Sequence, residues 1–567
     1  MADKPRMTLI AICLLCFFLR LGDSKLWDRD EPRNARCAAE MLERGDWVVP
    51  TFNDELRTHK PILTYWLMMI SYRLFGESEF AARFWSAVMA SGTVLLTYRF
   101  ARQFFDIKTA NWAAVILASN LMFNIAAHAA TPDASLIFFS TAAITAFAVG
   151  FDTPSPYARW MYFLLSYVSM GIAVLSKGPV GIVLPLTVCS AASWWLLTPN
   201  SETQHTNRSL IWLTSRLRLH HLFRTYRALQ LPWGLLVVGV VALPWYSLVG
   251  IQTDGVWLKE FFFEHNVGRA MRPMEGHSGP TLFYYPLAIL VGFFPWSVFA
   301  LPVVLWTYTQ CREKPPAGMI WLLAWTTVYV VTFSIASTKL PSYVTPIYPA
   351  LAILCGNLLT NWETATVPQR AWTWRAAGCL TLVGAGMVVT FPVTIHHWMP
   401  GDEWLGSIGL IPLVGGAMAF RSFQNDRWEQ GFRRIAYTSV GLILSLFAIA
   451  APRVSQHQHI DRLLANIPND GQHRLVSFGV HEPSWVFYAD DPIPFVPLDD
   501  TKNARIRMSS TTHVITSKSV FSQHRDKLPP DMRVMTQVPY FLKNDTLILL
   551  TRLPSEAIVS NRPSPSH

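Results

Sequence analysis

Long apolar stretches recur along most of this chain, and they constrain its fold more than any other feature. A helix needs about 20 apolar residues to cross a bilayer, and about thirteen stretches near that length alternate with polar connections. They cover residues 8–21, 80–98, 110–127, 135–150, 160–175, 178–197, 231–251, 283–308, 319–336, 344–359, 376–394, 405–420 and 435–450. Because 51% of the residues are hydrophobic and only 15% charged, we predict an all-α, multi-pass membrane protein with about 13 transmembrane helices.

The first apolar stretch has two interpretations. It is short and follows Lys4 and Arg6, which is typical of a cleaved secretory signal as well as of a first membrane helix. No convincing small-x-small cleavage site follows it, so we favour a retained helix.

Basic residues in the short connections predict the orientation. If the spans alternate, the basic connections all lie on one side, which should be cytoplasmic; they are residues 99–108, 208–227, 312–314, 370–375 and 421–434. The segment 22–79 then lies outside although it is also rich in Lys and Arg. Its acids are about as numerous, and long loops translocate largely regardless of charge. We expect a protein of the cell (inner) membrane with loops 22–79 and 252–282 on the extracytoplasmic side.

Nearly all unusual polar clusters fall on that predicted outer side. They are residues 26–33, 59–61, 131–133, 176–179, 264–269, 275–280 and 337–343. Charged groups this close to a bilayer are costly to desolvate and usually mark a site. Each cluster also has a simpler interpretation: a solvated loop for 28–33, snorkelling lysines for Lys177 and Lys339, and a helix-dipole partner for Asp133. Because the clusters segregate together, we predict one extracytoplasmic site.

The first loop, residues 22–79, is predicted to contain two helices in the membrane interface. Residues 34–44 place Ala35, Ala38, Ala39, Met41 and Leu42 on one helical stripe, and residues 61–75 form a more apolar helix. Pro61 suits a first helical turn, so His59 and Lys60 should stand at a helix N-terminus beside free backbone amides. An anion such as a lipid phosphate would be stabilised there.

The composition changes after Pro452. Short β-rich runs at 474–478, 512–516, 533–538 and 546–550 predict a small α/β domain over residues 452–567, extracytoplasmic by span parity. We expect the tail after Pro554 to be disordered. Residues 1–451 then form the membrane domain. A cover over the acceptor site is one interpretation of the smaller domain.

Several motifs resemble a known family of membrane enzymes. The first loop carries Trp27-x-x-Asp30-Glu31-x-Arg33, Ala38-Ala39-Glu40-Met41-Leu42-x-x-Gly45-Asp46-Trp47 and Lys60-Pro61-x-x-x-Tyr65-Trp66. In order downstream come Asp133, Ser176-Lys177-Gly178, Glu264-His265, Arg269 and Lys339-Leu340-Pro341-x-Tyr343. Over about the first two thirds of the chain, this pattern resembles the C-type integral-membrane glycosyltransferases (GT-C fold), specifically the bacterial aminoarabinose lipid A transferases and the protein O-mannosyltransferases.

The resemblance implies an inverting transfer of a sugar from a polyprenyl-phosphate donor to an extracytoplasmic acceptor, a lipid A-like glycolipid or a protein. The leaving lipid phosphate gains negative charge, so fixed cations stabilise the transition state. Candidates for this phosphate site are Lys60 and Arg269, followed by Lys177, Lys339, Tyr343 and Arg33. Asp30 matches the position of the carboxylate that orients or deprotonates the acceptor, with Glu31 beside it and Asp133 as a candidate partner.

Two departures from the family pattern concern the metal and the substrates. The aminoarabinose enzymes usually have Glu-Lys-Pro where this chain has His59-Lys60-Pro61, and that glutamate is implicated in a metal site. His59 and His265 are therefore candidate ligands for Zn or for Mg/Mn, although the ligand spacing of a structural zinc site is missing and loop histidines are more often hydrogen-bonded. The loop 273–280 also differs, so the resemblance fixes neither the sugar nor the acceptor.

A transporter for polyprenyl-phosphate-linked lipids or polysaccharides is the alternative function. Such a protein would bind the lipid phosphate without chemistry and should show polar residues deep within several spans, together with paired repeats. The sequence shows neither feature. We expect the donor lipid and the acceptor as partners and no nucleic acid.

Overall fold

The structure, a computed structural model, confirms an α-helical membrane protein with a small sheet domain. It describes residues 4–27, 30–197, 219–268, 271, 283–312, 314–465, 467, 474–499 and 511–552. Within these ranges nine helices are long and apolar enough to cross a membrane, or ten if the pair Ile107–Ala118 and Leu121–Ala127, bent by 67°, is one span. The nine are Glu79–Phe104 (α4), Asp133–Asp152 (α7), Pro156–Lys177 (α8), His220–Gln252 (containing α12, Leu231–Gln252), Ala317–Ile335 (α17), Pro341–Thr360 (containing α18, Tyr348–Thr360), Val367–Trp398 (α19), Glu403–Gln424 (containing α20, Leu410–Gln424) and Trp428–Leu464 (beginning with α21, Trp428–Leu444).

The remaining predicted spans are helical but short or broken. Two form shorter apolar helices, Met7–Phe18 and Val180–Leu196 (α9). The predicted span 283–308 is divided into α15 (Tyr284–Gly292), a short turn at Trp296–Phe299 and α16 (Ala300–Cys311). Pro295 lies at this break, where it has no N–H to donate to a helical hydrogen bond. The predicted spans and the observed helices therefore occupy the same parts of the chain, and they differ in the length and continuity of some helices.

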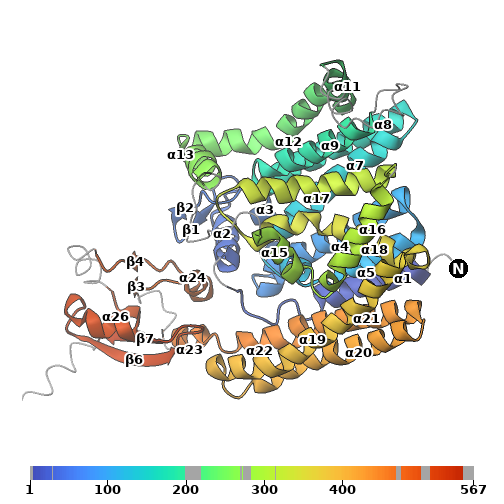
Figure 1. Cartoon of the computed structure of the whole chain (residues 1–567). Coiled ribbons are helices and arrows are strands. Elements are labelled where there is room, and N and C mark those ends of the chain that lie inside the picture. Colours follow the sequence, from blue (N-terminus) through green and yellow to red (C-terminus); the bar gives the residue numbers. More distant parts are fainter. Residues whose placement is uncertain are drawn as a thin grey trace, which may run out of the picture.

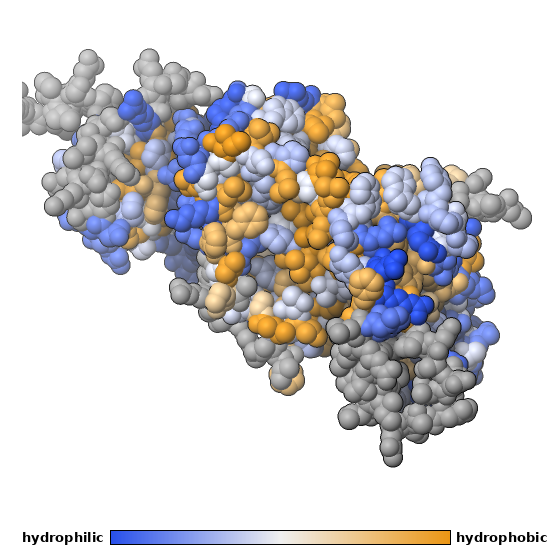
Figure 2. Space-filling model, turned by 90° about the horizontal axis from the view of Figure 1, so that it is seen from above, coloured by the Kyte–Doolittle hydropathy of each residue, from blue (hydrophilic) through white to orange (hydrophobic). Residues whose placement is uncertain are grey.

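The surface of the helical domain is suited to lipid. Figure 2 shows hydrophobic residues across the middle of the visible face and hydrophilic residues toward its two ends. In α19 only 11% of the most apolar 18-residue segment is buried inside the protein, and Leu382, Val389 and Val393 are exposed. An apolar surface of this extent needs a bilayer or a partner to cover it.

The first loop forms two helices joined by a short hairpin. They are α2 (Asp30–Arg44) and α3 (Leu63–Phe75), with strands β1 (Thr51–Phe52) and β2 (Glu55–Leu56) between them. α2 begins four residues before the predicted helix, with Asp30 and Glu31 in a first turn that favours acidic side chains. α3 begins at Leu63, after Pro61, so His59 and Lys60 do not flank its first turn as predicted. The apolar stripe of α2 is buried against α3.

The C-terminal domain is a five-stranded sheet with the strand order β4-β3-β5-β7-β6. The parallel strands are β3 (Leu475–Phe478), β4 (Phe495–Val496) and β5 (His513–Ser517). The hairpin of β6 (Met532–Pro539) and β7 (Thr546–Arg552) joins them antiparallel. The runs predicted from the sequence correspond to β3, β5, β6 and β7, whereas the two-residue β4 was too short to detect. The helix that begins at Trp428 continues past residue 451 into α22 (Ala451–Ser455), which leads toward this domain.

The sheet domain is docked on the first loop at one end of the helical domain (Figure 1). Helix α24 (Pro483–Ala489), which follows β3, packs against α2. Asn53 donates to the carbonyl of Ile493 at 3.0 Å and accepts from its N–H at 2.7 Å. The Tyr488 hydroxyl accepts from the N–H of Leu26 at 2.8 Å. These contacts fix the domain over the loop that carries the predicted site.

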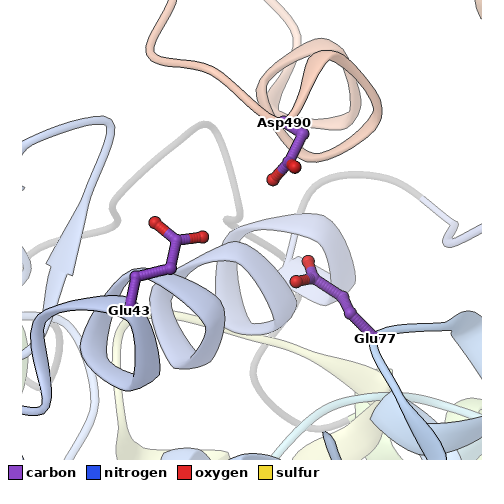
Figure 3. Close-up of side chains that lie close together, drawn as sticks. All are labelled: Glu43, Glu77 and Asp490. Carbon is purple, nitrogen blue, oxygen red and sulfur yellow. The ribbon is translucent and has the colours of Figure 1, made fainter.

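Three carboxylates meet beside this contact: Glu43 of α2, Glu77 after α3, and Asp490 at the end of α24 (Figure 3). Their oxygens lie within 4.8 Å of one another, the only such cluster of possible metal ligands in the described ranges. Partial desolvation at the junction, together with the charge of Asp490, raises the pKa of Glu77 to about 7. Arg36 contacts Glu43 at 3.0 Å and Asp490 at 2.5 Å, so the cluster is an ion-pair contact between the domains.

Candidate active site

A cavity of about 760 Å³ lies between the helical domain and the sheet domain. Seven residues predicted from the sequence line it: Asp30, Arg33, His59, Lys60, Asp133, Lys177 and Tyr343. They come from the first loop, the start of α7, the end of α8 and the segment before α18. The sheet domain and the segment leading to it close the opposite side with Gln458, His459, Glu482, Tyr540 and Lys543, among others. The structure therefore brings together residues that are hundreds of positions apart in the sequence.

Asp30 occupies the first turn of α2 and is accessible from the cavity. Desolvation raises the pKa of its carboxyl, but the charges of Lys60, Arg57, Arg33 and Lys177 outweigh this effect, and the pKa lies below its usual value. Asp30 is thus a carboxylate at neutral pH, ready to accept a hydrogen bond or a proton.

Lys177 and Asp133 form an ion pair on the wall of the cavity. Lys177 is the last residue of α8, and its ammonium donates to a carboxylate oxygen of Asp133 at the start of α7. The same nitrogen lies 5.5 Å from the centre of the Tyr343 ring. Side-chain exposures of 15% for Lys177 and 21% for Asp133 leave both groups partly open to the cavity. The pair limits how much of the Lys177 charge is available to a ligand.

Arg57 is a buried cation close to Asp30, and the sequence motifs did not identify it. The residue is 5% exposed, and its guanidinium donates to the Tyr65 hydroxyl at 2.9 Å and to the side-chain oxygen of Asn34 at 3.0 Å. Its charge contributes to the low pKa of Asp30. A fully buried arginine in a short hairpin has no sequence signal that separates it from an exposed one.

The two predicted metal ligands lie next to each other. The rings of His59 and His265 are 4.1 Å apart, and both line a smaller cavity of about 150 Å³ with Lys60, Lys177 and Tyr343. Desolvation and the charge of Arg57 lower the pKa of His59 to about 3, so its imidazole is neutral. Neutral imidazole is the form that binds metals. No third His, Cys, Asp or Glu joins them at ligand distance among the residues that the structure describes.

Two predicted residues line neither cavity. Glu31 is 5% exposed and forms an ion pair with Arg83 at 2.9 Å, while its carboxylate also accepts from the N–H groups of Trp27 and Ala130. The Lys339 ammonium donates to the carbonyls of Phe333, Ser334 and Ala336 at the end of α17. The Glu31 carboxylate and the Lys339 ammonium thus bind groups of the protein itself, an arrangement typical of structural residues. Arg269 lies outside the described residues.

The sheet domain adds polar groups that motif comparison missed. The Glu482 carboxylate accepts from the Tyr540 hydroxyl at 2.6 Å and from the Lys543 ammonium at 2.5 Å. The Phe541 ring meets the Trp27 ring edge-on at 5.7 Å, and both residues line the cavity. In the sequence, Tyr540, Phe541 and Lys543 lie in a turn between two β-rich runs. Such turns are common in proteins and indicate no particular site.

The arrangement provides a solvent-accessible carboxylate and a group of cations that line the same cavity. Such a site can bind an anionic leaving group on one side and orient a nucleophile on the other.

Comparison with known proteins finds similarity to membrane glycosyltransferases. Residues 59–223 match the family model described as dolichyl-phosphate-mannose-protein mannosyltransferase. Over 478 residues, 81% of this chain and 79% of the relative, the chain is 29% identical to the undecaprenyl phosphate-alpha-4-amino-4-deoxy-L-arabinose arabinosyl transferase of Erwinia tasmaniensis. It is 28% identical to the enzyme of that name from Shewanella sediminis, over 69% of this chain and 67% of the relative. An uncharacterised protein of Aquifex aeolicus is 28% identical over 70% of this chain and 73% of the relative.

The fold is that of a solved relative. The crystal structure of ArnT from Cupriavidus metallidurans, bound to undecaprenyl phosphate, superimposes with a TM-score of 0.75 at 21% identity, covering 98% of this chain and 99% of that one. By sequence this chain is thus similar to the aminoarabinose transferases and, over residues 59–223, to the protein mannosyltransferase family, and it shares the fold of ArnT.

Proposed function

We propose that this protein transfers a sugar from a polyprenyl-phosphate donor to an acceptor on the extracytoplasmic face of the membrane. The observation that carries the proposal is the convergence of Asp30, Lys60, Asp133, Lys177 and Tyr343 on one cavity. The solved relative binds undecaprenyl phosphate, which supports the same class of lipid here. The acceptor is a lipid A-like glycolipid or a protein.

In the proposed reaction the acceptor oxygen attacks the anomeric carbon as the bond to the lipid phosphate breaks. The leaving phosphate gains negative charge, and Lys60 and Lys177 stabilise it more in the transition state than in the ground state. Asp30 lies on the opposite side of the sugar, where it accepts the proton of a hydroxyl acceptor. If the acceptor is itself a phosphate, Asp30 mainly positions it. Attack from the face opposite the leaving group inverts the anomeric configuration.

The extracytoplasmic location rests on the distribution of charge. The cavity lies at the end of the helical domain that carries the first loop and the sheet domain (Figure 1). The short basic connections 99–108 and 421–434 join consecutive spans at the opposite end of the helical domain (Figure 1). Short loops rich in Lys and Arg are typical of the cytoplasmic side.

Lys60→Gln should weaken the binding of undecaprenyl phosphate by about tenfold or more. One unit charge about 4 Å away is worth about 4 kcal/mol at an effective dielectric near 20, and desolvation removes part of this value. Tenfold corresponds to about 1.4 kcal/mol. Affinity is measured by titrating the purified full-length protein in nanodiscs. Lys108→Gln, an exposed lysine outside the cavity, is the matched control. Unchanged affinity for Lys60→Gln would refute the phosphate assignment.

Sugar transfer itself is tested in proteoliposomes containing extracted polyprenyl-phosphate lipids and envelope acceptors. Radiolabelled sugar should move from the lipid fraction to the acceptor fraction. Binding of the lipid without any transfer, with native acceptors present, would favour the transporter alternative.

We further infer that His59 and His265 hold a divalent cation, Zn or Mg/Mn, beside the donor phosphate. Two adjacent imidazoles, one of them held neutral, suit zinc best, because imidazole nitrogen is a preferred zinc ligand and carboxylate and water oxygens suit magnesium. A cation bound there would supply positive charge to the phosphate. Two protein ligands leave coordination positions for oxygens of the ligand.

The two histidines should determine zinc affinity. His59→Ala and His265→Ala are each expected to lower the affinity of the purified protein for Zn²⁺ by about tenfold or more, measured by calorimetric titration. His397→Ala, at an exposed histidine near the end of α19, is the control. Equal zinc affinity in all variants would show that the pair is not a metal site.

A further inference from the structure

We propose that the sheet domain carries its own binding pocket for an oxyanion-bearing sugar of the acceptor, next to the transfer cavity. This inference rests on the proposed function and assigns part of substrate recognition to the small domain. The site is a pocket of about 300 Å³ lined by Arg33, Gly479, Val480, His481, Glu482, Pro483, Tyr540 and Lys543. The anionic group is a phosphate or a carboxylate, at a position remote from the attacking oxygen.

The topology of the sheet places this pocket where α/β domains bind ligands. The chain runs from β3 through α24 to β4 on one side of β3, and then to β5 on its other side. The connections that follow β3 and β5 therefore run in opposite directions, and ligands of open α/β sheets bind at the carboxyl ends of such a strand pair. The loop that follows β3, residues 479–483, forms one wall of the pocket. The turn between β6 and β7 supplies Tyr540 and Lys543 at the same edge.

The charged groups of the pocket favour an anion. Arg33 and Lys543 face it from two different domains, and Glu482 is the single carboxylate among its lining residues. One oxygen of Glu482 accepts from both Lys543 and Tyr540, which fixes the lysine in the turn. Lys543 also donates to the Tyr540 hydroxyl at 2.6 Å, so these two bonds use two of the three donors of its ammonium, and the side chain remains 51% exposed. The pocket thus has a lysine and an arginine in its lining and is large enough for a monosaccharide.

The pocket adjoins the transfer cavity. Arg33, Glu482, Tyr540 and Lys543 line both spaces. Arg33 and Asp30 are three residues apart on α2, so they lie on the same face, about one helical turn apart. An acceptor anchored at Arg33 and Lys543 would therefore present a neighbouring part of its structure to Asp30. The sheet domain would in this way determine which acceptor is used.

The test measures sugar binding to full-length protein in nanodiscs that already contain saturating undecaprenyl phosphate. Filling the lipid-phosphate site first keeps the probe out of it. The probes are glucose 1-phosphate, glucuronate, inorganic phosphate and glucose, titrated by saturation-transfer NMR. We expect glucose 1-phosphate or glucuronate to bind at least about tenfold more tightly than glucose, a difference of about 1.4 kcal/mol. Tighter binding of one of the two identifies the anionic group, and binding of inorganic phosphate alone would overturn recognition of a sugar.

Two variants should shift this affinity in opposite directions. Lys543→Gln should weaken binding of the anionic sugar by about tenfold, and Glu482→Gln should strengthen it, because it removes the competing negative charge. Lys518→Gln, an exposed lysine of the same domain outside both spaces, should have no effect. If Lys543 and Glu482 only stabilise the turn, the two substitutions should weaken binding of the anionic sugar in both variants or in neither. Either result would overturn the proposal. Failure of the first loading step, the binding of undecaprenyl phosphate, would instead refute the proposed function.

Discussion

Asp30→Asn should lower the rate of sugar transfer by about 10²- to 10⁴-fold, the usual contribution of general base catalysis. The asparagine keeps the size and most hydrogen bonds of the side chain but cannot take up a proton. Undecaprenyl phosphate should still bind, because the cations that hold it are unchanged. Loss of one negative charge near Lys60 should if anything strengthen that binding. Turnover in proteoliposomes and lipid affinity in nanodiscs measure the two effects separately.

The pH profile and a control variant sharpen this test. Since the pKa of Asp30 lies below its usual value, the carboxylate stays ionised from about pH 8 to about pH 5, and its contribution to turnover should be constant there. Asp54→Asn removes the same charge from an exposed turn of the first loop at φ 62°, a conformation that Asn tolerates. Its turnover should equal that of the parent. Full activity of Asp30→Asn would exclude this carboxylate from the reaction.

The membrane fold and much of the site follow from the sequence for physical reasons. Apolar runs near bilayer length define helices wherever they occur, because unpaired backbone groups cannot remain in lipid. The β-rich runs after Pro452 likewise correspond to strands in the structure. Charged motifs in separate loops share one cavity because they lie at the same end of alternating spans, as span parity predicts.

Other parts of the site depend on tertiary contacts that no local pattern records. Glu31 follows Asp30 directly and has the same chemistry, yet a helix turns about 100° per residue, so neighbours point in different directions. Lys339 has the motif position of a phosphate ligand, but its ammonium meets three carbonyls at the end of α17. Glu482 and Lys543 approach the cavity only because the sheet domain docks on the first loop, and this contact spans more than 400 residues of sequence.

Glu31→Ala should destabilise the folded protein by about 3–5 kcal/mol, the usual effect of removing one partner of a buried ion pair. The side-chain exposures are 3% for Arg83 and 7% for Glu31, and the guanidinium meets both carboxylate oxygens at 2.9 Å. Arg83 also donates to the carbonyls of Leu21, Ser24 and Lys25, so it stays buried with its charge uncompensated. The N–H of Ala130 loses its acceptor as well. A lower midpoint of thermal unfolding in detergent measures the effect.

Matched variants separate this structural role from a catalytic one. Glu429→Ala removes an exposed partner of Arg433, a pair 2.7 Å apart with side chains 71% and 61% exposed, and should cost at most about 1 kcal/mol. Replacing both Glu31 and Arg83 by Met should restore part of the lost stability, because no uncompensated charge then remains buried. Asp30→Asn should lower the unfolding midpoint less than Glu31→Ala, because the Asp30 side chain is exposed to the cavity and is not part of a buried ion pair. A Glu31→Ala protein that unfolds like the parent but transfers no sugar would reverse the assignment and make Glu31 a catalytic residue.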